Sequence, residues 1–248
     1  MTIWGMIIGG ATGFALGGPI GALLGAAAGH LAEKSMRGPQ NNEQARQVAF
    51  TVAVIALSAK MAKADGQVSR SEIEAFRQRV HIPQEEVARV GKFWDLARQT
   101  PEGFEAYASQ TANLFGPRNP ILEQLLELLF FIARADGEIK GSEWAYLAEV
   151  SRLFGYDEQD FRHFSDMWGQ TETPPHSLLG VAEDAGLEEI RTAWKRLVKE
   201  YHPDRLRAEG LPDEFVEAAN DKLAAINTAY KVMRAAAERR AAGQPQQS

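Results

Sequence analysis

Residues 187–234 read LEEIRTAWKRLVKEYHPDRLRAEGLPDEFVEAANDKLAAINTAYKVMR, and this stretch carries the clearest fold signal in the chain. Apolar residues recur three or four positions apart on both sides of a central His-Pro-Asp, which is typical of amphipathic helices. The first stripe consists of Ile190, Trp194, Leu197 and Tyr201, and the second of Phe215, Ala219, Leu223, Ile226, Tyr230 and Met233. Two such helices are expected to pack antiparallel, with the tripeptide His202-Pro203-Asp204 exposed at one end.

The face of the first helix opposite its apolar stripe is basic. It carries Arg191, Lys195 and Lys199, with Arg196 beside them. A positive stripe suits an acidic groove on a partner protein, where it speeds encounter and sets orientation. Pro203 stiffens the turn, so that His202 and Asp204 are presented at little ordering cost. The residue types alone leave open a plainer interpretation, a solvated basic face next to an ordinary turn.

The stretch and its flanks resemble the J-domain family. Residues 178–181, LLGV, are similar to the family's entry motif, and residues 225–230, AINTAY, are similar to a pattern in its third helix. The resemblance implies an antiparallel helical hairpin over residues 176–240. It also implies that the tripeptide and the basic face bind a DnaK-type chaperone, whose ATP hydrolysis His202 and Asp204 accelerate.

Several features depart from the family pattern. His176-Ser177 replaces an aromatic pair, and a long loop is expected at residues 206–212. No glycine- and phenylalanine-rich linker or cysteine zinc repeat follows, so direct holding of unfolded clients is not expected. Residues 241–248 are predicted to form a disordered tail.

Residues 43–168 form a second helical region, which contains a repeat. The segment AKADGQV at 62–68 recurs as ARADGEI at 133–139, and Glu72 and Glu143 fall at matching offsets. Alternating strand patterns are nearly absent, so the whole chain is predicted to be all-α. The region resembles TerB-type (tellurite-resistance-like) helical domains. Polar linkers are predicted on either side of it, at residues 35–42 and 169–175.

The repeated acidic residues admit two interpretations. Asp65, Glu72, Asp136 and Glu143 could converge about a pseudo-twofold axis and bind a hard cation through oxygen. They could instead stabilise turns and helix starts, since Ser69 with Glu72 fits a capping box, although Lys140 breaks that pattern in the second copy. The structural role is favoured because no other ligand type repeats, and neither a metal nor a cofactor is predicted.

Residues 1–34 are predicted to form a membrane anchor. No Asp, Glu, Lys or Arg occurs from Ile3 to Ala32, and a helix of that length exceeds the hydrocarbon core of about 30 Å. A single span is favoured over a hairpin broken at Pro19. Lys34 and Arg37 follow the span, so positive charge predicts a periplasmic N-terminus and cytoplasmic domains. Glycine recurs at every fourth position, which favours a homodimer in the membrane through Gly9, Gly13, Gly17, Gly21 and Gly25.

Composition excludes several classes of function. The chain has 248 residues, no cysteine and a formal net charge of −6, so it has no disulfide or thiolate metal site and no general attraction to nucleic acid. No Walker A loop, GxSxG elbow or HExxH pair occurs, and no enzymatic activity is predicted. The order of anchor, TerB-like domain and J domain resembles the DjlA family, DnaJ-like co-chaperones of the bacterial inner membrane. A second hypothesis is a membrane scaffold or envelope-stress signalling protein that acts mainly through the TerB-like domain.

Overall fold

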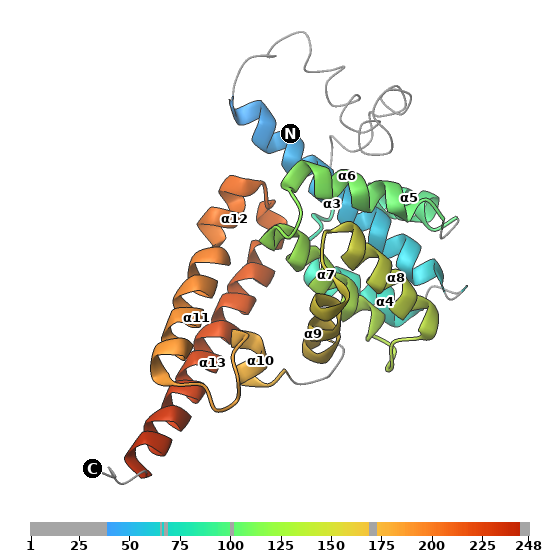
Figure 1. The fold of residues 1–248 in the computed structure, drawn as a ribbon. Helices are drawn as coiled ribbons and strands as arrows, with labels where there is room; N and C mark the ends of the chain where they lie inside the picture. Colours follow the sequence, from blue (N-terminus) through green and yellow to red (C-terminus); the bar gives the residue numbers. More distant parts are fainter. Residues whose placement is uncertain (1–38, 65, 67–68, 100–101, 169–172, 244–248) are drawn as a thin grey trace.

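The computed structural model describes residues 39–64, 66, 69–99, 102–168 and 173–243 (Figure 1). No strand occurs in these ranges, and the prediction of an all-α protein is confirmed. The middle domain contains α3 (Pro39–Ala64), α4 (Arg70–Arg79), α5 (Val87–Ala97), α6 (Phe104–Phe115), α7 (Pro120–Ala133), α8 (Gly141–Leu153) and α9 (Glu158–Trp168). The C-terminal part contains α10 (Pro175–Leu179), α11 (Leu187–Glu200), α12 (Pro203–Glu209), a 3-10 turn (Asp213–Phe215) and α13 (Val216–Gly243). The predicted anchor and its glycine row lie outside the described residues.

Helix α3 is the centre of the middle domain. Every residue from Val48 to Ala62 is buried, and α5, α6, α7 and α8 pack around the helix. A helix that is apolar on all sides is stable in water only when other elements cover it. The stretch Arg46–Ala64 is long and apolar enough to cross a membrane, but 83% of its apolar window is buried inside the protein, as in a core helix.

The start of α3 differs from the predicted linker at residues 35–42. The helix begins at Pro39, so residues 39–42 are helical. Proline suits this position because its fixed φ matches the helix and the first turn needs no N–H bond.

In each repeat of the middle domain, a glutamate side chain caps the N-terminus of the helix that follows. At the start of α4, Glu72 N–H donates to Ser69 Oγ at 3.1 Å and Ser69 N–H donates to Glu72 Oε2 at 2.6 Å, which confirms the predicted capping box. In the second copy, Glu143 Oε2 accepts a hydrogen bond from Lys140 N–H at 2.8 Å. The carboxylate half of the motif therefore persists where lysine replaces serine.

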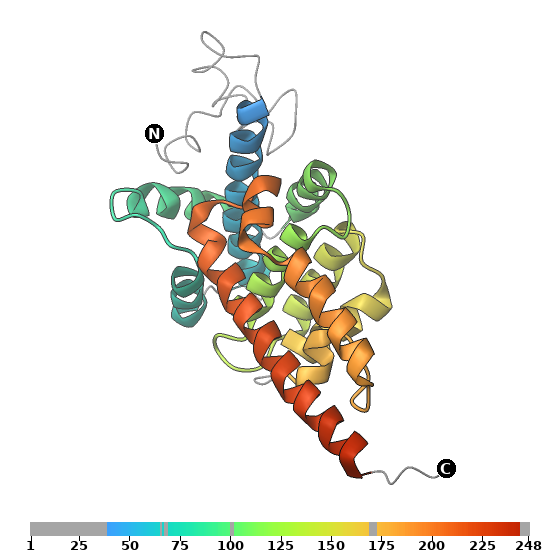
Figure 2. The ribbon, with the colours of Figure 1, turned by 90° about the vertical axis from the view of Figure 1, so that its left-hand side faces the viewer.

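Helices α11 and α13 lie side by side and antiparallel, as predicted (Figures 1 and 2). Trp194 stacks on Tyr230 with ring centroids 4.5 Å apart, and the Trp194 indole N–H donates to Asn227 Oδ1 at 2.8 Å. The hairpin has its own buried core, formed by Leu179, Ala185, Ile190, Leu197, Tyr201, Ile226, Ala229, Met233 and Ala237. The far end of the pair is therefore packed on side chains of the C-terminal part itself.

The segment after the tripeptide is more regular than predicted. Instead of a long loop at residues 206–212, α12 runs from Pro203 to Glu209, and the 3-10 turn follows after a short connection. At the C-terminus, α13 continues to Gly243, so residues 241–243 of the predicted tail are helical. Residues 244–248 lie outside the described residues.

The apolar stripe predicted for the second helix divides between two cores. Ile226 and Met233 face α11, whereas Phe215 and Ala219 belong to the core of the middle domain. Phe215 meets the ring of Phe50 on α3 edge to face, with centroids 5.0 Å apart. The two domains thus share a core at the end of the hairpin that carries the tripeptide.

Candidate functional site

The tripeptide lies where α11 gives way to α12. His202 is the N-cap of α12, and its Nδ1 accepts a hydrogen bond from Asp204 N–H at 3.3 Å. Pro203 occupies the first helical position and is buried. The side chains of His202 and Asp204 are 52% and 79% exposed, which confirms the predicted exposure of both groups. The structure thus presents an imidazole and a carboxylate on a turn whose proline is packed into the protein.

Asp204 is oriented by a neighbouring arginine. Arg207 Nη1 donates to Asp204 Oδ1 at 3.1 Å, while Arg207 Nε donates to Asp213 Oδ1 at 3.0 Å. Ion pairs between exposed side chains contribute about 0–1 kcal/mol. Arg207 therefore orients the Asp204 carboxylate, but the carboxylate can leave this ion pair easily when a partner binds. The group remains accessible to a partner.

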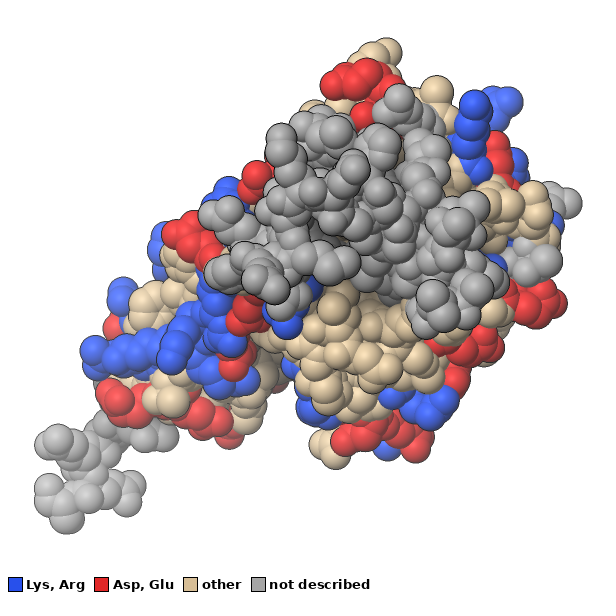
Figure 3. Space-filling view, turned by 90° about the horizontal axis from the view of Figure 1, so that it is seen from above, with Lys and Arg blue, Asp and Glu red and all other residues tan. Residues whose placement is uncertain are grey.

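The basic face of α11 is open to solvent. Its members are Arg191, Lys195, Arg196 and Lys199, all of them exposed. Seen from above, lysine and arginine side chains gather on the hairpin side of the molecule (Figure 3). Two members have weak partners on the same helix, because Arg191 lies 4.0 Å from Glu188 and Arg196 lies 3.8 Å from Glu200. The residues that the resemblance implied for chaperone binding therefore share one accessible end and side of the hairpin.

Behind the tripeptide, four polar side chains join the hairpin to α7. We name them the interdomain cluster: Glu123, Glu127, Tyr201 and Lys222. Lys222 Nζ donates to Glu123 Oε1 and to Glu127 Oε2, both at 2.9 Å. The Tyr201 hydroxyl donates to Glu123 Oε2. Rings from both domains cover the ammonium, since Lys222 Nζ lies 4.5 Å from the Tyr201 ring centroid and 4.9 Å from that of Trp168.

The protonation states of this cluster follow from its burial and charges. Burial lowers the pKa of Lys222, but the attraction of the two carboxylates outweighs it, and the pKa lies above its usual value. Burial, and then the charge of Glu123, raises the pKa of Tyr201 well above its usual value. At neutral pH the cluster therefore holds a charged lysine and a neutral tyrosine.

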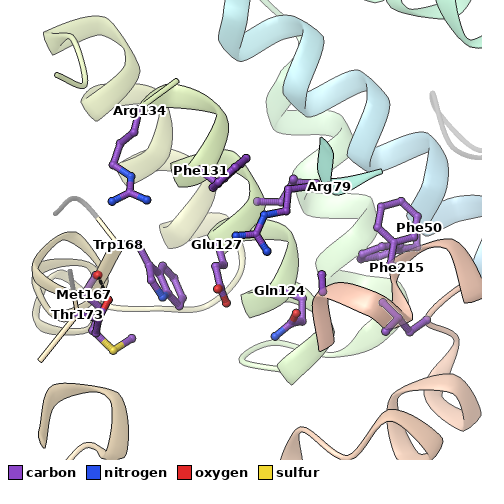
Figure 4. Close-up of a pocket in the computed structure, with 13 residues that line it drawn as sticks. Phe50, Arg79, Gln124, Glu127, Phe131, Arg134, Met167, Trp168, Thr173 and Phe215 are labelled. Carbon is purple, nitrogen blue, oxygen red and sulfur yellow. Dashed lines mark hydrogen bonds between the residues drawn. The ribbon is translucent and has the colours of Figure 1, made fainter. Parts of the chain in front are cut away.

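A cavity of about 150 Å³ lies next to the cluster, between α7 and the start of α13. Figure 4 shows Phe50 and Phe215 at one end of it and Trp168 at the other, with Glu127 between them in this view. The amide Nε2 of Gln124, which lines the cavity, is buried without a hydrogen-bond partner. The two domains are thus closely packed at the aromatic rings and at the interdomain cluster, and the cavity lies between these two contacts.

Three of the four acidic residues considered for a metal, Glu72, Asp136 and Glu143, lie within the described residues, where they make hydrogen bonds and ion pairs of their own. Glu72 and Glu143 are buried and cap helices, and Asp136 pairs with Lys140 Nζ at 3.1 Å. Asp65 lies outside the described residues. Within the described ranges, no group of three or more His, Asp or Glu side chains is placed to hold a metal ion. The geometry supports the capping interpretation of the repeat.

Three family models match consecutive parts of the chain. Residues 1–47 match the co-chaperone DjlA transmembrane domain, residues 51–166 match the tellurite resistance protein TerB, and residues 175–242 match the DnaJ domain. These matches follow the predicted order of anchor, TerB-like domain and J domain. From here on, the middle domain is called the TerB-like domain and the C-terminal hairpin the J domain.

Relatives align with almost the whole chain. The co-chaperone protein DjlA of Photobacterium profundum is 30% identical to it, over 94% of this chain and 98% of the relative. This chain belongs to the DjlA family. The DjlA proteins of Vibrio cholerae (29% identical, 94% and 98% covered) and Shewanella oneidensis (30%, 93% and 96%) are similarly related. No solved structure matches the chain significantly. As a DjlA family member, the protein is a membrane-anchored J-domain co-chaperone.

Sequence reasoning missed the interdomain cluster, although one signal was present. Lys222 falls in register with Phe215, Ala219 and Ile226, at offsets of four, seven and eleven residues along the helix. A lysine within an apolar stripe indicates a buried ammonium, and such a group requires anionic partners. Glu123 lies 99 residues earlier in the chain, so no local pattern could identify it as that partner.

Proposed function

We propose that this DjlA family member recruits a cytoplasmic DnaK-type chaperone through the tripeptide and the basic face, and stimulates its ATP hydrolysis. The observation that carries the proposal is the exposure of His202 and Asp204 on a structured end of the J domain, beside the basic face of α11. A basic stripe draws in an acidic partner surface, and a stiff turn then docks without a large ordering cost. The names of the relatives, co-chaperone proteins, support this function. In this proposal the ATP site belongs to the partner, and this chain supplies the docking surface.

The test is single-turnover ATP hydrolysis by a DnaK-type chaperone, with the full chain in detergent micelles. Wild type is expected to accelerate hydrolysis and His202→Gln to abolish most of the acceleration. His81→Gln is the matched control, because it makes the same change at an exposed position of the TerB-like domain. Equal stimulation by wild type and His202→Gln would contradict the proposal, as would no stimulation by either. A cellular phenotype that is insensitive to His202→Gln would instead favour the scaffold or signalling hypothesis.

For the anchor we propose a single span of the inner membrane, with a periplasmic N-terminus, cytoplasmic domains and a homodimer through the glycine row. The charge-free segment, Lys34 and Arg37 support the orientation, and the spacing of the glycines supports the dimer. Because the chain has no cysteine, a single cysteine at Thr2 can be labelled by a membrane-impermeant reagent in cells with permeable outer membranes. Protection of that cysteine would exclude the proposed orientation. Replacing Gly13 and Gly17 with leucine is expected to lower association in a membrane reporter assay.

A further inference from the structure

The interdomain cluster is built around a lysine that is almost completely buried. Only 5% of the Lys222 side chain is exposed, and the two carboxylates that bind it stand one turn apart on α7. A buried ammonium is stable only when it is paired and hydrogen-bonded. Lys222 therefore holds the J domain in a defined position on the TerB-like domain, because leaving that position would strip it of both partners.

The cluster is linked directly to the tripeptide. Tyr201 is the C-cap of α11 and immediately precedes His202. Its hydroxyl bonds the same Glu123 carboxylate that binds Lys222, and its ring is buried against the ammonium. One glutamate of the TerB-like domain thus fixes the residue at which α11 ends and the tripeptide begins.

The other side of the tripeptide is also held by the TerB-like domain. Leu206 of α12 and Leu211, just after it, are buried in the core of that domain. Asn119 Nδ2 at the start of α7 donates to Glu209 Oε2 at 3.2 Å, and Glu209 Oε1 accepts from Arg205 Nε at 2.7 Å. The segment on each side of His202 and Asp204 is therefore attached to the TerB-like domain, while these two side chains remain exposed.

We propose that the TerB-like domain positions the tripeptide for the chaperone, with Glu123 as the positioning residue that acts through Tyr201. The inference rests on the proposed function and adds a role for the TerB-like domain in it. Only 17% of the Glu123 side chain is exposed, so its route to the tripeptide is the hydrogen bond from Tyr201. It restricts the conformations of the exposed turn, so that less ordering remains to be done when the chaperone binds. Weakening this contact is expected to loosen residues 201–209 without unfolding the J domain.

Hydrogen exchange of the full chain in detergent tests the positioning without any partner. Glu123→Gln keeps the size of the side chain but replaces the charge-assisted hydrogen bond from Tyr201 with a weaker one to a neutral amide, and it removes the ion pair with Lys222. Tyr201→Phe removes only the hydroxyl. Both are expected to raise exchange in residues 201–209 at least tenfold, with residues 226–237 of the J-domain core unchanged. Glu238→Gln, at the far end of α13, is the control and should behave as wild type. Unchanged exchange in residues 201–209, or an equal rise throughout the J domain, overturns the inference.

The ATPase assay then connects the positioning to function. Both variants are expected to raise the concentration for half-maximal stimulation at least fivefold, while the maximal stimulated rate stays close to that of wild type. If both variants stimulate hydrolysis with the same half-maximal concentration as wild type, the inference is overturned. An effect of Glu123→Gln without one of Tyr201→Phe overturns the route through Tyr201. If wild type itself gives no stimulation, the proposed function fails, and the exchange data alone decide whether Glu123 positions the turn.

Discussion

Replacing Lys222 with methionine measures how much the interdomain cluster stabilises the protein. Methionine keeps an unbranched apolar stem, so the main loss is the charge and its donors. Breaking a buried ion pair by removing one partner costs about 3–5 kcal/mol. Glu123 and Glu127 are 17% and 32% exposed, so water relieves part of their mutual repulsion. We therefore expect the free energy of unfolding to fall by about 3 kcal/mol, the lower end of that range.

Urea unfolding of the full chain in detergent micelles, followed by circular dichroism and tryptophan fluorescence, provides the assay. Because Phe215 and Ala219 are packed into the core of the TerB-like domain, wild type is expected to unfold both domains in one transition. In Lys222→Met the J domain should detach first, so that the two probes no longer coincide. The midpoint shift and the separation of the probes report the same loss of contact.

A triple variant separates lost attraction from an uncompensated buried charge. In Glu123→Gln/Glu127→Gln/Lys222→Met no charged group remains at the site, and the new amide oxygen at position 123 would still accept from the Tyr201 hydroxyl. Removing both partners of a buried pair is much less costly than removing one, so this variant should regain most of the lost stability. A single Lys222→Met variant that stays within about 1 kcal/mol of wild type would refute the reasoning, since an exposed pair contributes no more than that.

The pH dependence of this contribution has a defined sign. The pKa of Lys222 is higher in the folded chain than its ordinary value of 10.5. The stabilisation is therefore fully present below that ordinary value and is lost only as the pH rises through the raised one. The difference in stability between wild type and Lys222→Met should stay constant from pH 7 to about pH 9.

Two further predictions concern the J-domain contact and the TerB-like core. Gly210, which ends α12, has a φ of +111°, and a Cβ added there would lie 2.8 Å from Arg46 Cβ. Gly210→Ala should therefore lower the free energy of unfolding, measured in urea, by about 1–3 kcal/mol. An unchanged midpoint would show that the contact with Arg46 adapts freely. Burial raises the pKa of Glu143; the hydrogen bond from Lys140 N–H opposes this shift, and the charge of Glu72 adds to it. A raised carboxyl pKa means that stability is lost as the pH rises from about 4.5 through the folded value, so wild type should lose stability over that range relative to Glu143→Gln. Parallel pH profiles of the two proteins would contradict the shift.

Much of the architecture follows from local patterns. The spacing of Ile190, Leu197 and Tyr201 identifies a helix with one buried face, because a period of 3.6 residues places these side chains together whatever lies opposite. The capping box of Ser69 and Glu72 is equally local, since its two hydrogen bonds close within three residues. The tripeptide with its flanking motifs was enough to indicate the J-domain family.

Other expectations were wrong where the local structure depends on contacts with residues distant in the sequence. The second apolar stripe was expected to pack against the first helix of the hairpin. Its first two members, Phe215 and Ala219, instead pack against the TerB-like domain, because Phe50 of α3 lies at that end of the hairpin. The segment after the tripeptide was expected to be a loop, yet Leu206 and Leu211 find a core to enter, and burial of apolar side chains favours an ordered helix.

The sequence by itself determined most of the helices and the exposure of His202 and Asp204, because these depend on the spacing of side chains within one segment. Only the tertiary structure decided what stands behind the tripeptide. Lys222, Tyr201 and Glu123 come from three helices, and their meeting depends on how the J domain packs on α7. A periodic pattern predicts that a helix face is buried. It does not predict which charged residues contact that face, because these belong to a segment distant in the sequence.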